Sequence, residues 1–258
     1  MTTTLKIGTV SAEVGNWQRF LNQQALADWD DRPLVDDEVF GGRTDFVTKR
    51  WQRIESLTPT GTVSALDRAR AKAKGFIPFI QARNYTRIHP QKRAVDLIVI
   101  HTMENAEKPS AAEDVALWFA GLTKYDPPRA SAHYNIDQDS TVQSVRDMDV
   151  AWHAPGTNHN GIGIEHAGRA AQTALQWNDE PSRAILERSA LLAARLSRLY
   201  AIPVLKLSVD DLQHGLRGFI GHVDATLAFP GKSRTHTDPG PNFPWQQYLS
   251  LVRGYLAG

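Results

Sequence analysis

The first third of the chain alternates short amphipathic segments with turns. Between residues 8 and 75, apolar positions recur at the three- and four-residue spacing of a helix with one buried face. These positions are Trp17, Phe20 and Leu21, then Val47, Trp51 and Ile54, then Val63, Leu66, Ala69 and Ala73, with Gly75 closing the third segment. The pattern predicts a small all-α domain of three helices over residues 1–78.

Two of these segments contain a related string. Trp17-Gln18-Arg19-Phe20 is matched by Trp51-Gln52-Arg53-Ile54. Because only two copies exist, the similarity indicates a quasi-repeat inside a bundle rather than a solenoid, and core packing is its simplest explanation. The segment that follows contains Gly75, Pro78 and Pro90, and we expect a linker over residues 79–90.

From residue 91 onward the hydrophobic pattern changes. A continuous apolar run over 97–100 is typical of a strand covered on both faces, and similar patterns predict strands over 161–165 and 218–222 and a hairpin over 132–136 and 141–145. Helical spacing predicts helices over 110–122 and 181–200. Alternating strands and helices favour an α/β domain over 91–258, with a mixed central sheet flanked by helices.

Composition removes several classes of function. The 258 residues are 41% hydrophobic and 22% charged, and 29 Lys and Arg balance 28 Asp and Glu. We therefore expect a folded protein that binds no nucleic acid. The start of the chain lacks the apolar run of a secretory signal and no stretch could cross a bilayer. We expect synthesis in the cytoplasm without a signal peptide, no membrane insertion, and a monomer.

The chain has nine His and no Cys, so a metal site would be built from His, Asp and Glu. His101 and His222 each follow an apolar strand, at the end where α/β sites usually form. Asp238, within Thr-Asp-Pro-Gly-Pro, offers a carboxylate held by a stiff turn. Three protein ligands leave one position open, where zinc lowers the pKa of water from 15.7 to about 7.

A general base should stand close to such a site. Glu165 ends the predicted strand over 161–165, where burial would raise the pKa of its carboxyl toward a useful range. Taken one at a time, each of these His and Glu residues would more often be structural than catalytic.

The order of six motifs changes this weighing. They are the strand ending in His101, Ser131-Ala132-His133-Tyr134, Ala151-Trp152-His153-Ala154, Gly163-Ile164-Glu165, Gly221-His222-x-Asp224 and Thr237-Asp238-Pro239-Gly240. In this order they resemble the type 2 N-acetylmuramoyl-L-alanine amidases of bacteria and phages. The resemblance implies zinc held by His101, His222 and Asp238, a catalytic Glu165, and cleavage of the amide between N-acetylmuramic acid and L-alanine in peptidoglycan.

The chain departs from that family near the third ligand. His222 and Asp238 stand 16 residues apart (238 minus 222), which is longer than usual, and Phe229-Pro230-Gly231 resembles an insertion. His236 occupies the position of a common family Lys and is expected to stabilise the oxyanion. An alternative stays open, in which His236 replaces Asp238 as the ligand.

The remaining candidates have weaker support. Trp152, His153 and Tyr134 are expected to line the substrate groove, although a half-buried loop aromatic is equally ordinary. His133 is expected to be a hydrogen-bonded structural residue. Asp224 could orient a ligand imidazole by accepting its other N–H.

A second resemblance covers the first quarter of the chain. The order Gly8-x-Val10, Trp17-Gln18-x-Phe20-Leu21, Val35-Asp36, Phe40-Gly41, Thr44, Trp51-Gln52 and Gly61-x-Val63 is similar to the peptidoglycan-binding three-helix domain. That family usually has Asp-Gly-x-Phe-Gly, whereas the turn here is longer.

The expected lack of a signal peptide, together with a wall-binding domain beside an amidase domain, resembles a phage-type endolysin that lyses the cell wall after release from the host cytoplasm. The alternative is a non-catalytic peptidoglycan-binding or sensing protein of the same fold. Glycan cleavage by paired carboxylates is less favoured, since no suitable acidic pair accompanies the His motifs.

Overall fold

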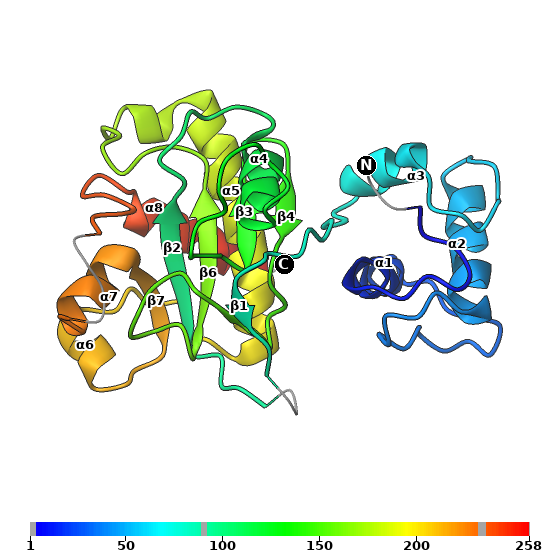
Figure 1. The fold of residues 1–258 in the computed structure, drawn as a ribbon, viewed down its shortest axis with the longest axis horizontal. Coiled ribbons are helices and arrows are strands. Elements are labelled where there is room, and N and C mark those ends of the chain that lie inside the picture. The colour runs from blue at the N-terminus through cyan, green and yellow to red at the C-terminus, as the bar shows by residue number, and fades with distance from the viewer. Residues whose placement is uncertain (1–3, 89–91, 232–235, 258) are drawn as a thin grey trace. The chain divides into compact units, whose positions relative to one another are not determined.

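The computed structural model describes residues 4–88, 92–231 and 236–257. The chain forms two compact units, Met1–Phe79 and Ile80–Gly258 (Figure 1). Among the described residues, no helix is both long and apolar enough to cross a membrane.

The first unit is built from three helices, α1 (Ala12–Gln23), α2 (Gly42–Ile54) and α3 (Ala65–Lys72). Side-chain caps start two of them: Ser11 accepts from the backbone of Val14, and Ser64 forms a capping box with Asp67. The apolar faces meet in one aromatic core that includes Trp17, Phe20, Trp51 and Phe76. The three helices are those that the hydrophobic spacing predicts, but part of the predicted apolar faces is wrong: Ile54 and Leu66 are 61% and 65% exposed, and Ala69 and Ala73 are exposed as well.

The quasi-repeat has a structural explanation. Trp17 and Trp51 pack edge to face at a centroid distance of 5.2 Å, and the Gln that follows each Trp is buried. Gln18 accepts from the backbone of Glu38, and Gln52 accepts from the backbone of Gly61. Each Trp-Gln pair thus supplies one core side chain and one amide that bonds a loop backbone. Gln18 bonds the segment before α2, and Gln52 bonds the segment after it.

The boundary between the units differs from the predicted linker over 79–90. Ile80 and Ala82 donate backbone hydrogen bonds to Gln143 and Ser144, and β1 (Tyr85–Thr86) pairs with β5 (Val150–Ala151). Residues 80–86 therefore belong to the second unit, because their backbone groups are satisfied by its strands. Residues 89 and 90 of the predicted linker lie outside the described residues.

The second unit is an α/β domain around a five-stranded sheet in the order β4-β3-β6-β2-β7. Its strands are β2 (Leu97–Thr102), β3 (Tyr134–Ile136), β4 (Thr141–Gln143), β6 (Gly161–His166) and β7 (Gly218–Gly221). β3, β6, β2 and β7 run parallel, and β4 is antiparallel at the edge. The carboxyl ends of β6, β2 and β7 consequently share one edge of the sheet, where α/β sites form.

Helices cover both faces of this sheet (Figure 1). On one face lie the long α5 (Glu180–Tyr200), preceded by the 3-10 turn η1 (Gln176–Asn178), and α8 (Trp245–Ala257). The other face carries α4 (Ala111–Phe119), α6 (Val209–Gln213) and α7 (His222–Ala228). An apolar cluster that includes Val99 and Ile220 joins α6 and α7 to this second face.

Candidate metal centre and active site

Two histidines and one aspartate meet at the carboxyl edge of the sheet. His101 lies in β2, His222 is the first residue of α7 directly after β7, and Asp238 lies in the loop before α8. β2 and β7 are parallel neighbours, so their ends deliver both imidazoles to the same place. The structure thus brings together the three residues that the sequence predicts as zinc ligands.

Asp224 fixes the start of α7 rather than an imidazole. Its carboxylate accepts from the backbone N–H of Gly221 at 2.6 Å and from Lys206 Nζ at 2.8 Å. The first contact completes the cap of the helix whose first residue is His222. Asp224 therefore positions His222 through the backbone, and the expectation of a direct contact with a ligand ring is replaced by this role.

The three side chains offer one ligand atom each, and these atoms lie within 4.8 Å of one another. His101 Nδ1 is 2.9 Å from Asp238 Oδ2, and His222 Nδ1 is 3.3 Å from Asp238 Oδ1. Ligands in a tetrahedral zinc site with bonds of about 2.1 Å lie roughly 3.4 Å apart. Two imidazoles and a carboxylate are also donors that zinc accepts, so the residues fit a zinc ion with one open position.

The three residues are buried, and burial governs their ionisation. Desolvation lowers the pKa of His101, which the neighbouring Asp238 only partly offsets. Burial would raise the pKa of Asp238, but its close contacts with the imidazoles of His101 and His222 outweigh that effect and hold the pKa far below its ordinary value. The Asp238 carboxylate therefore stays ionised and burial favours the neutral form of His101, which are the protonation states that a metal requires of these two ligands.

Glu165 stands on β6 directly opposite His101 on β2. Residues paired in this way point to the same face of a sheet, so the carboxyl group lies on the face of the three candidate ligands. Burial raises the pKa of Glu165 well above its ordinary value, with further increases from Asp238 and Glu104. Its Oε2 has no hydrogen-bond partner among the described residues, which leaves it free to exchange a proton with a substrate.

His236 lies at the outer side of the cluster. Its ring stacks on that of His222 at a centroid distance of 3.8 Å, and its Nδ1 is 3.8 Å from Asp238 Oδ1. The side chain is 49% exposed. Because Asp238 is buried against both ligand histidines while His236 is half exposed, the geometry favours Asp238 over His236 as the third ligand. Residues 232–235, in the long segment between His222 and Asp238, lie outside the described residues.

Two residues predicted to line a substrate groove are not placed to do so. Tyr134 pairs with Ile164 and therefore points to the sheet face opposite Glu165; its buried hydroxyl donates to Asp147 at 2.6 Å. His153 is buried as well, and its ring contacts His101 instead of a surface groove. Alternation along the strand explains the first error, and a contact across 52 residues of chain explains the second.

Trp152 and His133 occupy more ordinary positions. Trp152 is 38% exposed and donates through Nε1 to Thr86 Oγ1 at 2.9 Å, so its contact with substrate stays a prediction. His133 is fully buried and accepts from the backbone N–H of Gly163. Both of its ring nitrogens face backbone groups, since Nε2 is 3.2 Å from the carbonyl of Asp149, which is the structural arrangement that the sequence predicts.

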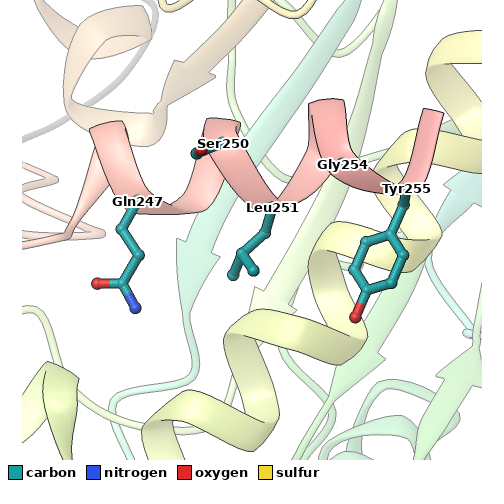
Figure 2. Close-up of a pocket in the computed structure, with 5 residues that line it drawn as sticks. All are labelled: Gln247, Ser250, Leu251, Gly254 and Tyr255. Carbon is teal, nitrogen blue, oxygen red and sulfur yellow. The ribbon is translucent and has the colours of Figure 1, made fainter. Parts of the chain in front are cut away.

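A surface hollow elsewhere on the second unit shares no residue with the histidine cluster. Figure 2 shows the side chains that line it along one side of α8: Gln247, Ser250, Leu251, Gly254 and Tyr255. It has no titratable group other than the Tyr255 phenol and no converging ligands. The converging side chains suited to hydrolytic chemistry therefore lie at the carboxyl edge of the sheet and not in this hollow.

Comparison with known proteins identifies a family for the second unit. Residues 91–241 match the model of the N-acetylmuramoyl-L-alanine amidase family, a range that contains His101, Glu165, His222 and Asp238. N-acetylmuramoyl-L-alanine amidase A of Achromobacter lyticus is 31% identical over 176 residues, which cover 66% of this chain and 89% of that protein.

Solved structures show weaker similarity. The selenomethionine derivative of AmpD is 21% identical, with a TM-score of 0.48 over 68% of this chain and 94% of that one. The Staphylococcus aureus hydrolase AmiA, in complex with its ligand, is 18% identical, with a TM-score of 0.49 over 75% of this chain and 90% of that one. By the match over residues 91–241 and the similarity to the Achromobacter enzyme, this chain belongs to the N-acetylmuramoyl-L-alanine amidase family.

Proposed function

We propose that the protein is a zinc-dependent N-acetylmuramoyl-L-alanine amidase, in which His101, His222 and Asp238 hold the metal. The observation that carries this proposal is the convergence of two imidazole nitrogens and a buried carboxylate within 4.8 Å, with Glu165 on the neighbouring strand. When bound, zinc would supply a Lewis acid that polarises the scissile carbonyl and acidifies water.

Glu165 would handle the proton in this reaction. Its raised pKa makes the carboxylate a stronger base than an exposed glutamate, so it can take a proton from the attacking water. The resulting carboxylic acid then returns that proton to the amine nitrogen of L-alanine as the carbon–nitrogen bond breaks. The lactyl carboxylate of N-acetylmuramic acid and a peptide with a free amino terminus are the two products.

His236 would stabilise the oxyanion that forms on the carbonyl. Its half-exposed ring lies beside His222 at the outer side of the cluster, where an N–H can reach a substrate that arrives from solvent. A neutral imidazole offers one such donor, and a hydrogen bond that strengthens as charge develops lowers the barrier.

Product analysis tests the amidase proposal directly. Purified peptidoglycan is digested with the protein as prepared, with a chelator, and with zinc restored after chelation. We expect mass spectrometry to find peptides that begin with L-alanine and glycan strands with free lactyl groups, except in the chelated sample. Binding without product would instead favour the non-catalytic alternative, and new reducing sugar ends would indicate glycan cleavage.

We further propose that the first unit anchors the enzyme to the wall and that the whole chain acts as a phage-type endolysin. The support is the similarity of residues 8–63 to the peptidoglycan-binding three-helix domain, together with a separate core for this unit. A tether raises the local concentration of substrate without changing the site.

Truncation tests the anchoring role. Residues 1–79 should co-sediment with intact sacculi, and a chain beginning at Ile80 should lose activity on sacculi while it keeps its activity on soluble muropeptides. Equal activity of both forms on sacculi would contradict anchoring. For the endolysin role, the protein produced inside bacteria should lyse them only after the membrane is permeabilised.

A further inference from the structure

We propose that His153 is a positioning residue that holds the imidazole of His101 in the tautomer whose Nδ1 lone pair faces the metal site. This inference rests on the proposed zinc site. The central observation is a contact between two buried rings, in which His101 Nε2 lies 3.0 Å from His153 Nδ1. His101 Nδ1 meanwhile faces Asp238, so the ring has one nitrogen toward each neighbour.

A backbone carbonyl fixes the direction of the hydrogen bonds. His153 Nε2 lies 3.3 Å from the carbonyl oxygen of Gly161, and a carbonyl oxygen can only accept. His153 is therefore protonated on Nε2, and its Nδ1 is an acceptor. His101 must then donate from Nε2, which leaves the Nδ1 of a neutral ring without a proton. The Gly161 carbonyl thus sets the proton position on His153, and His153 in turn sets the proton position on His101.

The position of His153 is built into the fold. Gly161 and Gly163 lie on the same face of β6, and a Cβ atom on Gly163 would approach the His153 ring to 2.6 Å. The missing side chains let the imidazole lie against the strand. The backbone N–H groups of His153 and Ala154 both donate to Asn158 Oδ1, at 3.0 and 2.6 Å. These contacts also explain the glycines of the Gly-Ile-Gly-Ile-Glu strand, where glycine is otherwise unfavourable.

The tautomer matters because of what His101 faces. With Nδ1 unprotonated, a lone pair and a carboxylate oxygen of Asp238 stand 2.9 Å apart, and two acceptors at this distance repel unless a cation lies between them. In the other tautomer His101 would donate from Nδ1 to Asp238, and both ligand atoms would be occupied by that hydrogen bond. His153 therefore disfavours the tautomer in which His101 donates to Asp238 and favours the one that can bind a metal. Residues that orient metal-bound histidines have this role.

Two substitutions at the same position test this role. In His153→Asn the amide oxygen can lie near the former Nδ1 and accept from His101, whereas His153→Leu fills the volume without an acceptor. Zinc affinity is measured by competition with a chelator. We expect His153→Leu to weaken zinc binding about 10- to 100-fold, and His153→Asn to restore most of it. His166→Leu is the matched control, because it also removes a buried imidazole, but one that bonds the backbone carbonyl of His101 and not its ring.

Nitrogen NMR of the metal-free protein gives a readout that needs no zinc. The His101 signals should show protonation at Nε2 in the wild type and in His153→Asn, and a shift toward Nδ1 protonation in His153→Leu. Gly163→Ala should act in the same direction, since its new methyl group would displace the His153 ring. An unchanged tautomer and unchanged zinc affinity in a folded His153→Leu protein would overturn the inference. Failure of the wild type to bind zinc would instead overturn the proposed metal function, with the NMR comparison still deciding the role of His153.

Discussion

Both faces of the central sheet bury histidine side chains, but the ring nitrogens have different kinds of partner on the two faces. On the face covered by α5 and α8, His166 has a partner for each ring nitrogen: the carbonyl of His101 at 3.0 Å and Ser189 Oγ at 2.7 Å. Ser189 in turn bonds the hydroxyl of Tyr248 at 2.8 Å. On the opposite face, His101 and His222 converge on Asp238, and Glu165 Oε2 has no partner among the described residues.

The difference separates structure from chemistry. A buried polar network in which every atom is satisfied stabilises one conformation and has nothing left to bind. Buried ligand atoms that converge, beside a carboxyl oxygen without a hydrogen-bond partner, destabilise the fold unless a metal or substrate binds them. Such an arrangement therefore indicates a site. Burial and residue type alone would not distinguish His166 from His101, since both are buried histidines on β-strands. Their partners do.

The largest expected effect comes from a substitution on the sheet face that carries His101 and His222. His222→Ala removes one of three ligands, so we expect loss of bound zinc and of detectable amidase activity. Elemental analysis of the purified variant measures the metal, and release of L-alanine peptides measures the activity. His166→Ala is the control from the other face, and it should be less stable yet keep its zinc. A His222→Ala protein that retains one zinc per chain would remove His222 from the site.

Glu165→Gln should sharpen the comparison by leaving the metal in place. The amide has the shape of the carboxyl group but cannot exchange a proton, so we expect the turnover number to fall about 100- to 10,000-fold. Zinc content and unfolding behaviour should match those of the wild type. Turnover within a few-fold of the wild type would show that another group carries the proton, and His236 would be tested next.

On the face covered by α5 and α8, acid should lower the free energy of unfolding by protonating His166. Burial lowers the pKa of His166 from 6.5 to about 4, so between these values the unfolded chain binds a proton that the folded chain does not. This contribution to stability is complete above pH 6.5 and is lost as pH falls toward 4, by up to about 3 kcal/mol. Urea unfolding of the metal-free protein, compared with His166→Asn over this range, measures it. Parallel pH profiles for the two proteins would contradict the assignment.

Much of this architecture follows from local patterns. The apolar run over 97–100 becomes part of β2, and the helix predicted over 181–200 is α5 almost residue for residue. Such segments are predictable because each one buries a face whose period is visible in the sequence. The strand predicted over 218–222 is one residue too long, since His222 already begins α7.

The patterns miss what depends on distant contacts. α7 is only 7 residues long, too short for a periodic signal, and α8 was not predicted. The structure brings His101, His222 and Asp238 together, and for the two histidines this follows from strand ends that meet at one edge of a parallel sheet. The contact between His101 and His153 joins residues 52 positions apart, and only the glycines at 161 and 163 hint at it. Tyr134 was misplaced because motif proximity ignores the alternation of side chains along a strand.

The smallest expected effect concerns Tyr134 and tests its assignment to the face covered by α5 and α8. Its hydroxyl donates to Asp147 Oδ1, while Tyr200 of α5 donates to the other oxygen of the same carboxylate. Tyr134→Phe removes this donor to Asp147 and one acceptor of Gln143 Nε2, which keeps its contacts with Val145 and Asp147. The apolar ring stays in place, so the unfolding free energy should fall by about 1 kcal/mol. The Michaelis constant and turnover number on muropeptides should change less than about 2-fold, because the ring points away from Glu165 and His101. A large rise in the Michaelis constant, with stability unchanged, would return Tyr134 to the substrate groove and show that the two faces are not as separate as the sheet register places them.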